Sequence, residues 1–490
     1  MKSDDSEKSL FGAIPTEEWG TGSGGWTAIV DVATGEQIGS VALALDSDVE
    51  QAGKIAAAAQ LTWAAAPFRS RIAVIERARS ALEAMRGDLQ ALMIRETGAL
   101  RTKANHEIDK TIDELRSAAG LPDQPYGELL PHDEPSVLSM ARRVPVGVIG
   151  VIAPWNAPLM LAMRSIAPAI ALGNAVILKP DVKTALSGGS VIAQIFREAG
   201  LPDGIFQVVV GGPDIGEALV RSPHTDMISF TGSSAAGRRV GEVAGGLLKR
   251  VVLELGGNNA FIVFEDADLD NALIHAQRGT FAHQGQICMA TGRHLVHESI
   301  ADEYVRRLTA YAKSLKIGNP TSTRVTMGPL IDERQARRVQ AVVDDAVAGG
   351  ATITTGGRYE GPFYQPTVLD GVDEANAAFQ AEIFGPVAPI TRFSTDEEAI
   401  RLAGASNYGL SAAIHTRDVS RALAIAARLR TGMVHINGQT INDSAHIPMG
   451  GMGQSGNGGR YGGHWNLDEF TYWQWVTSRP SPPSAPRSEH

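Results

Sequence analysis

The stretch Val144-Pro-Val-Gly-Val-Ile-Gly-Val-Ile-Ala-Pro-Trp-Asn-Ala-Pro158 determines which fold class we expect for this chain. It opens an uncharged run of 20 residues, 144–163, which is long enough to cross a membrane. Its prolines at 145, 154 and 158 fit a strand, a turn and a helix start better than a membrane span. A strand covered on both faces has a continuous apolar sequence. The stretch therefore predicts a buried parallel strand that leads through a loop into a helix.

Strand-like and helix-like runs alternate after residue 144, and a second alternating block starts near Asn259. Such alternation is typical of βαβ units and parallel sheets. The length of 490 residues also favours two or three domains. We expect strands at 146–153, 175–178, 205–210, 227–230, 251–255, 260–264, 386–393 and 433–437, and helices at 159–170, 188–198, 215–220, 235–244, 301–314 and 333–348, with another from Leu269.

Other segments flank these blocks. Residues 46–118 are rich in Ala, Leu, Glu and Arg at helical spacing, and residues 122–137 contain four prolines and read as a break or an extended excursion. The aromatic run 470–476 is strand-like, and we expect it in a core or a subunit interface. The first twenty residues are expected to form a loose arm, and the Pro- and Ser-rich tail 478–490 to be disordered.

The composition restricts the partners and the location of the protein. Lys and Arg number 44 against 54 Asp and Glu, a formal net charge of −10. This balance disfavours nucleic acid and anionic membranes as partners, although it is compatible with a local basic pocket for an anionic cofactor. No signal peptide is visible at the acidic N-terminus, and a single cysteine suits a reducing compartment, so we expect a cytoplasmic protein.

Three strand-to-helix turns carry residues that suit a nucleotide. The segment Phe230-Thr-Gly-Ser-Ser-Ala-Ala-Gly237 follows a strand, and Gly212 and Gly216 lie at another turn. Small residues there either let phosphate approach a helix N-terminus or serve tight packing alone. Neither turn has a GxGxxG fingerprint. Gly232 and Gly237 have the spacing of a P-loop, but Arg238 and Arg239 stand where a P-loop has Lys and Ser or Thr, which argues against one. Lys179 ends a third strand, where parallel sheets bind ligands, so the three turns together favour a nucleotide site.

Cys288, Glu254 and Asn156 are the candidate reactive residues. The only cysteine, Cys288, is either a buried filler or a nucleophile. Glu254 ends an apolar strand and is either a base or a cap or surface charge. Asn156 follows another strand and either donates to an oxyanion or caps the helix at Pro158. A hydrolase built on Cys288 and His283 would leave the nucleotide signals unexplained.

These stretches jointly resemble the aldehyde dehydrogenase superfamily over about residues 20–476. The interval of 34 residues between Glu254 and Cys288 fits the family as well. Segments 253–260 and 283–297 are most similar to its benzaldehyde and vanillin dehydrogenase branch. The matching motifs, in the family's order, are Pro154-Trp155-Asn156, Lys179-Pro180, Phe230-Thr-Gly-Ser233, Glu254-Leu-Gly-Gly257, Gly285-Gln-Ile-Cys288, Glu382-Ile-Phe-Gly-Pro386 and Ser455-Gly456.

The resemblance implies oxidation of an aldehyde with NAD or NADP. Cys288 would attack the aldehyde carbon while the Asn156 amide and the Cys288 N–H hold the oxyanion. Loss of hydride would leave a thioester, which water activated by Glu254 would hydrolyse. Glu254 thereby argues against a CoA-acylating dehydrogenase, and the intact trio argues against a non-catalytic homologue.

The resemblance also assigns cofactor contacts. Lys179 and Glu382 would hold the two riboses, Ser233 the pyrophosphate, and Phe384 would pack near the nicotinamide ribose. Many members carry a glutamate where this chain has Val182, so the choice between NAD and NADP stays open. The further contacts implied are Ile152, Pro154, Trp155, Asp181, Gly212, Gly216, Gly232 and Leu255.

The substrate tunnel, by position, is mostly apolar, which suits an aryl ring and also a medium-chain aliphatic aldehyde. His294 and His297 stand three apart on a strand and so face opposite sides, and we expect no metal site. Gly453 replaces a lysine that is common in the family, with no evident function. The expected tunnel residues are Ala157, Leu161, Arg164, Ile287, Met289, Ile441 and Met449.

The expected architecture is a Rossmann-like parallel-sheet cofactor domain, a second α/β catalytic domain and a small β oligomerisation element. The cofactor domain would comprise residues 1–121 and 144–254, and the catalytic domain residues 255–440. Residues 122–143 and 462–477 would form the oligomerisation element of a homodimer or homotetramer.

Overall fold

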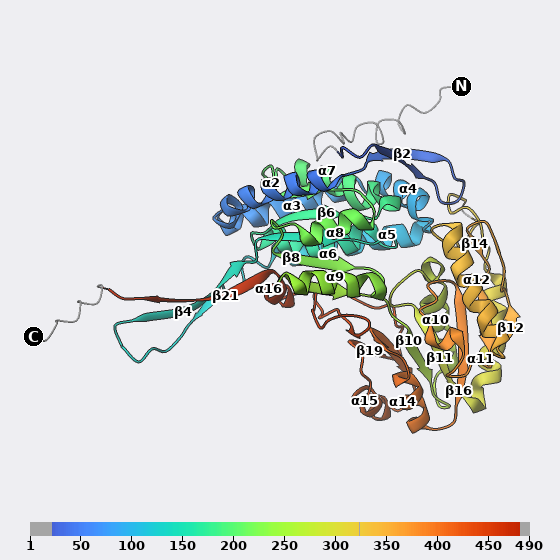
Figure 1. The fold of residues 1–490 in the computed structure, drawn as a ribbon. Coiled ribbons are helices and arrows are strands. Elements are labelled where there is room, and N and C mark those ends of the chain that lie inside the picture. Colours follow the sequence, from blue (N-terminus) through green and yellow to red (C-terminus); the bar gives the residue numbers. More distant parts are fainter. Residues whose placement is uncertain (1–21, 323, 481–490) are drawn as a thin grey trace, which may run out of the picture.

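The computed structural model describes residues 22–322 and 324–480. In this part of the chain two larger sheets are packed among helices, and a narrow arm projects away from them (Figure 1). No helix in the described ranges is long and apolar enough to cross a membrane. The arm expected at the first twenty residues lies outside the described residues, as does the tail beyond residue 480.

The stretch 144–163 folds into the strand, loop and helix that the sequence predicts. β5 (Val148–Ile152) is buried along its whole length at the centre of a parallel sheet ordered β7-β6-β5-β8-β9. α6 (Pro158–Ala171) starts with proline, and every residue in it except Met160 is buried. The other strands are β6 (Ala175–Lys179), β7 (Phe206–Val208), β8 (Met227–Thr231) and β9 (Arg250–Glu254).

Seven helices join α6 around this sheet. α2 (Asp46–Ala64), α3 (Phe68–Ala84), α4 (Arg86–Thr97) and α5 (Arg101–Ala119) confirm the helical spacing of residues 46–118. The others are α7 (Val191–Glu198), α8 (Pro213–Arg221) and α9 (Ser234–Gly246). α7 starts later than residue 188, because Leu186–Ser190 form a π-helical turn whose glycines pack against Pro158 and Pro180.

The second alternating block forms a seven-stranded sheet ordered β12-β15-β16-β11-β10-β18-β19. All neighbours are parallel except the pair β12 and β15. The predicted strands near 260, 386 and 433 and the strand expected to carry His294 and His297 are confirmed, whereas β12, β15 and β18 had no prediction. The bounds are β10 (Asn259–Val263), β11 (Thr291–His297), β12 (Thr352–Thr355), β15 (Thr367–Asp370), β16 (Val387–Phe393), β18 (Ser411–His415) and β19 (Met433–Ile436). Its helices include α10 (Leu269–Phe281), α11 (Glu298–Ser314), α12 (Glu333–Ala348), α14 (Asp396–Gly404) and α15 (Val419–Ala426).

The projecting arm is an antiparallel sheet ordered β21-β4-β3. Its strands are β3 (Gly127–Leu129), β4 (Leu138–Pro145) and β21 (Thr471–Ser478), and β21 follows the short α16 (Trp465–Phe470). In the aromatic run, Phe470 is buried in the core, whereas Trp473 and Trp475 on β21 are 50% and 68% exposed. β21 also extends to Ser478, which pairs with Leu138, and the expectation of a disordered tail from residue 478 is wrong at that residue.

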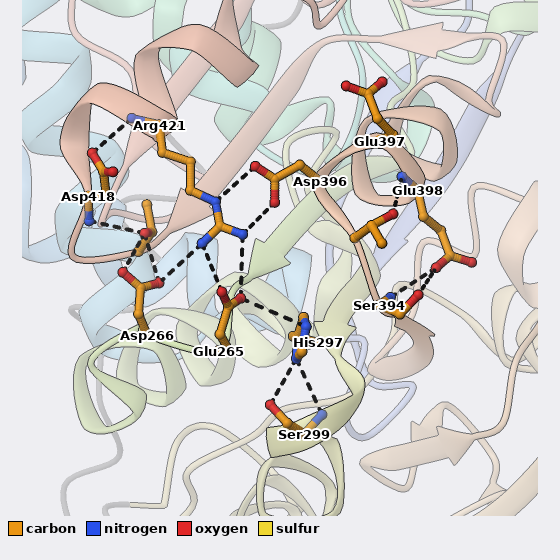
Figure 2. Close-up of polar contacts among 12 residues, drawn as sticks. Glu265, Asp266, His297, Ser299, Ser394, Asp396, Glu397, Glu398, Asp418 and Arg421 are labelled. Carbon is orange, nitrogen blue, oxygen red and sulfur yellow. Dashed lines mark hydrogen bonds and ion pairs between the residues drawn. The ribbon is translucent and has the colours of Figure 1, made fainter.

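Arg421 binds carboxylates at the carboxyl edge of the seven-stranded sheet (Figure 2). From α15, its guanidinium contacts Glu265 and Asp266, which follow β10, and Asp396, which follows β16. Glu265 also lies 3.9 Å from the imidazole of His297 at the end of β11. The hydrogen bonds from Arg421 hold the pKa of Asp396 below its usual value. Arg421 thus joins the ends of β10 and β16, and Glu265 extends this network to His297 at the end of β11.

We expect Arg421→Met to lower the free energy of unfolding by about 1–3 kcal/mol, because it leaves three clustered carboxylates without their common partner. Thermal and denaturant unfolding measure this change. Arg428→Met is the matched control, because among the described residues Arg428 forms an ion pair only with the exposed Glu397. That control should leave the free energy of unfolding nearly unchanged, because exposed ion pairs contribute little. Equal losses in the two variants would contradict a special role for Arg421.

Candidate active site

Cys288 lies in the turn that leads into β11, at the amino edge of the seven-stranded sheet. The residues before it form a left-handed turn, with φ of +48° at His283, +56° at Gln284 and +71° at Gly285. The Gln284 amide holds this turn by donating to the carbonyls of Gly98 (3.0 Å) and Pro329 (2.7 Å). Such φ values are unusual for residues other than glycine and persist only under tertiary constraint. The turn therefore fixes the direction in which Cys288 leaves it.

Asn259 and Asn156 hold the loop of Cys288 from two sides. The Asn259 amide, at the start of β10, donates to the carbonyls of Cys288 (2.9 Å) and Ala290 (2.7 Å). The Asn156 Nδ2 donates to the Gln286 carbonyl at 2.9 Å. One hydrogen of the Asn156 amide remains for another acceptor. α6 is capped at Ala157 without a side-chain bond, so the helix-cap alternative for Asn156 is wrong.

Glu254 is the last residue of β9 and is buried, and neither carboxylate oxygen has a hydrogen-bond partner. Burial raises the pKa of Glu254 to about 8, and the charges of Arg164 and Arg460 only partly oppose this effect. A helix cap would have a backbone donor and a surface charge would be solvated, so both alternatives for Glu254 are wrong. An unpaired carboxyl group with a pKa near neutrality is suited to exchange protons.

Cys288 is partly exposed, and its thiol is in an acidic environment. Burial, followed by the charges of Glu382 and Glu254, raises the pKa of Cys288 to about 12. The thiol is therefore protonated at neutral pH, and it must lose this proton to become the reactive thiolate.

Lys179 ends β6 and is buried, with one hydrogen bond of 3.3 Å to the Pro180 carbonyl. Burial lowers its pKa. Gly216 of α8 lies beside it, and an added Cβ there would contact the side chains of Lys179 and Ile152. The structure thus brings together three of the predicted cofactor residues. The Asp181 carboxylate, in contrast, accepts from the N–H of Lys183 and caps a short 3₁₀ turn.

The N-termini of α8 and α9 lie at the carboxyl edge of the five-stranded sheet. Ser233 is the N-cap of α9 and accepts from the N–H of Ala236 (3.3 Å), and Gly212 is the N-cap of α8. Gly232 leaves no room for a side chain, because a Cβ would approach the Phe230 ring to 2.6 Å. Helix N-termini with small residues are suited to anionic groups such as phosphates.

Glu382 and Phe384, just before β16 of the seven-stranded sheet, contact loops that follow strands of the five-stranded sheet. Glu382 accepts from the N–H of Gly257 at 3.0 Å, and a Cβ at Gly256 would come within 2.1 Å of its carboxylate. Burial raises the pKa of Glu382 to about 7. Phe384 has a φ of +54° and meets the ring of Trp155 edge-on, with ring centroids 5.5 Å apart. The absence of a side chain at Gly256 therefore makes the close approach of Glu382 possible. The N–H of Leu255, which lies between Glu254 and Gly256, donates to the Ser455 carbonyl.

The predicted tunnel residues lie in two groups. Ile287, Met289, Ile441 and Met449 form one apolar cluster with Cys288. Ala157 and Leu161 lie at the start of α6, whereas the buried Arg164 further along pairs with Glu114 and Asp443. Three members of the cluster were missed, because nothing in their local sequence distinguishes them from strand and turn residues. They are Leu410, Met433 and Ile447.

The chain matches the family model described as the aldehyde dehydrogenase family over residues 19–476. The chain belongs to the aldehyde dehydrogenase family. It is 48% identical over 486 residues to the NAD+ benzaldehyde dehydrogenase of Pseudomonas putida, covering 99% of this chain and 100% of the relative. It is 50% identical over 476 residues to a vanillin dehydrogenase of an Amycolatopsis species, covering 97% and 98%. The betaine aldehyde dehydrogenase of Staphylococcus aureus in complex with NAD+ has the same fold, with a TM-score of 0.94 and 30% identity over 99% of both chains.

Membership in the aldehyde dehydrogenase family confirms the predicted fold class and the assignment as an NAD(P)-dependent oxidoreductase that acts on aldehydes. The residues present fit such a cofactor. A buried ammonium at Lys179 and a buried carboxylate at Glu382 are a donor and an acceptor for hydroxyl groups, and the cradle at Gly232 admits no side chain. In the described part of the chain, no group of three or more His, Cys, Asp or Glu residues is placed to hold a metal ion. His294 bonds instead to Thr280 and Tyr304.

Gly453 stands where a lysine is common in the aldehyde dehydrogenase family, and its backbone conformation favours glycine at this position. It lies in β20 (Met452–Gly453), which pairs with β17 (Tyr408–Gly409). Its φ is +61°, and a Cβ would lie 2.6 Å from the carbonyl oxygen of Asn407. A side chain at this position would strain the pairing and displace the neighbouring turn.

We expect Gly453→Ala to lower the free energy of unfolding by about 1–3 kcal/mol, because both the positive φ and the contact with Asn407 oppose a Cβ. Denaturant unfolding measures the loss. Gly404→Ala is the control, because an added Cβ at Gly404 meets nothing within 4 Å. The control should be neutral or slightly stabilising. A neutral Gly453→Ala would contradict the backbone explanation.

Proposed function

We propose that this dehydrogenase oxidises aromatic aldehydes of the benzaldehyde and vanillin type to carboxylic acids. The observation that carries this proposal is the cluster of apolar side chains around Cys288, which would give an aryl ring apolar contacts beside the nucleophile. Relatives named for benzaldehyde and vanillin are about half identical to this chain over nearly its full length, which supports the same substrate class.

In the proposed first step, the Cys288 sulfur bonds to the aldehyde carbon and the thiol proton passes to water, so that the unpaired carboxylate of Glu254 stays free for the later hydrolysis. The free hydrogen of the Asn156 amide and the N–H of Cys288 would donate to the oxygen that becomes negative. Preorganised donors of this kind lower the barrier, because they need no rearrangement as charge develops.

In the proposed cofactor site, Lys179 and Glu382 would hold the ribose hydroxyls, Ser233 and Gly212 would lie against the phosphates, and Phe384 would pack beside the nicotinamide end. The remaining assigned contacts are Ile152, Pro154, Trp155, Asp181, Gly216, Gly232 and Leu255. The bound cofactor supplies the acceptor for the hydride that the adduct loses.

The thioester left on Cys288 is then hydrolysed by water in this proposal. Glu254 removes a proton from the water, and Asn156 again donates to the carbonyl oxygen. A carboxylate without competing hydrogen bonds can accept this proton directly. Hydrolysis by water distinguishes the proposed reaction from transfer of the acyl group to coenzyme A.

We further propose that residues 1–121 and 144–254 serve as the cofactor domain and residues 255–440 as the catalytic domain of a cytoplasmic homodimer or homotetramer. The exposed indoles of Trp473 and Trp475 on β21 support a second copy as the partner, because such residues are seldom left in water. Residues 122–143 and 462–477 would contribute to that interface. A free catalytic thiol is best preserved in a reducing compartment.

We expect kcat to rise with pH up to about 8 and then level off, because the base acts only when Glu254 is ionised and its pKa is about 8. Steady-state rates between pH 6 and 9 test this. Glu254→Gln should remove the rising limb and accumulate an acyl group on Cys288, seen as added mass on the intact protein. Cys288→Ala, the control, should carry no added mass. Normal turnover by Glu254→Gln would rule out its role as base.

We expect kcat/KM for benzaldehyde and vanillin to exceed that for hexanal by about tenfold or more, because a rigid ring fills an apolar pocket with less loss of entropy. Each aldehyde is assayed with NAD and with NADP, which also measures the cofactor preference left open by Val182. A preference for hexanal would contradict the aromatic assignment without affecting membership in the family.

A further inference from the structure

Lys103 and Glu107 form a buried ion pair on α5, one helical turn apart, below the loop that carries Asn156. The Lys103 ammonium donates to the main-chain carbonyl of Asn156 at 2.8 Å. The second oxygen of Glu107 accepts from the N–H groups of Leu159 (3.0 Å) and Met160 (3.3 Å), in the first turn of α6. The pair thus binds the chain at Asn156 and again three and four residues later.

The burial of this pair has no evident benefit for stability. Its side chains are 16% and 2% exposed, and removing two charges from water costs about as much as their attraction returns. Exposed pairs at the same spacing, such as Lys54 with Glu50, hold no loop. Apart from the bond between them, the side chains of Lys103 and Glu107 bond instead to the backbone of Asn156 and of the first turn of α6.

The side chain of Lys103 holds the main chain of Asn156 by donating to its carbonyl oxygen. Among the described residues, no main-chain N–H outside regular elements donates to the Asn156 carbonyl. The buried His283 ring also faces the backbone of Asn156 and interacts with it, but neither ring nitrogen meets the distance and angle of a hydrogen bond, whereas Lys103 does. The side chain of Asn156 is fixed separately, by the carbonyl of Gln286 at 2.9 Å. Asn156 is therefore held at two points, one from α5 and one from the loop of Cys288.

We propose that Lys103, held in place by Glu107, is a positioning residue for Asn156 that sets the direction of the amide hydrogen facing the oxyanion. This inference rests on the proposed oxyanion role of Asn156. Lys103 touches neither the substrate nor the reacting atoms, and it acts through the peptide of Asn156. Loss of one oxyanion donor lowers kcat by about 10²–10³-fold, and displacement of a donor by about 1 Å has an effect of about 10²-fold.

The test is a double-mutant cycle of Lys103→Met and Asn156→Ala, read by the rate of the NADH burst in a single turnover with benzaldehyde and NAD+. Lys103→Met alone should slow the burst by about 10–100-fold, with a smaller change in KM. In the Asn156→Ala background the same change should have less than about a threefold effect, because the residue it positions is gone. Lys103→Arg should recover part of the rate.

Two controls separate positioning from a folding defect. The double variant Lys103→Met, Glu107→Gln removes the carboxylate charge that Lys103→Met alone leaves buried and unpaired. The carbonyl oxygen of the introduced glutamine can still accept from the N–H groups at the start of α6. This double variant should show the same slow burst as Lys103→Met. Lys110→Met, on the same helix, removes a lysine that donates to the carbonyl of Asp443, and it should leave the burst within about threefold of wild type. Alkylation of Cys288 by iodoacetamide, which needs no oxyanion donor, should proceed at one rate in all variants.

The outcomes distinguish the two proposals. A wild-type burst in Lys103→Met, or losses that multiply in the double variant, would overturn the positioning role while leaving the oxyanion role of Asn156 in place. A parallel fall in alkylation and burst would also overturn it, in favour of a general disturbance of the site. A wild-type burst in Asn156→Ala would overturn the oxyanion role itself and this inference with it.

Discussion

A parallel sheet that is covered on both faces can present polar side chains only at the ends of its strands, and this constraint places the chemistry of the protein. The carboxyl edge of the five-stranded sheet supplies Lys179 and Glu254, the last residues of β6 and β9. The amino edge of the seven-stranded sheet supplies Cys288, just before β11. The site forms because these two edges face each other, and Asn156 bonds directly to the loop of Cys288 across the junction.

The carboxyl edge of the seven-stranded sheet and the active site differ in how their charges are compensated. At the carboxyl edge, Arg421 contacts three carboxylates and keeps the pKa of Asp396 low. At the active site, burial without equivalent partners raises the pKa of Glu254 to about 8 and that of Cys288 to about 12. The carboxyl edge is therefore neutralised by ion pairs, whereas the active site holds Glu254, which gains or loses its proton near neutral pH. Unsatisfied polar groups lower stability, and here they coincide with the proposed reaction centre.

The secondary structure around the site was largely predictable from sequence. The buried run that became β5, the proline that starts α6 and the glycines beside Glu254 have local patterns with clear physical causes. β18 was missed because it begins and ends with polar residues, Ser411 and His415, whose partners come from distant segments. Lys103 and Glu107 were missed for a related reason. On a helix their spacing is that of an ordinary surface ion pair, and only the packing of α6 onto α5 buries it.

The sequence by itself determined the fold class, the family and the identity of the single thiol, because strand and helix periodicity and short motifs are local properties of the chain. Only the tertiary structure decided that Glu254 is buried and unpaired, that Asn156 is held by Lys103 and Gln286, and that Arg164 is neutralised by two carboxylates. Burial, proton affinity and the direction of a hydrogen bond depend on which distant residues approach a group. Those approaches are fixed when the two sheets pack edge to edge, since no stretch of sequence contains both sides of the contact.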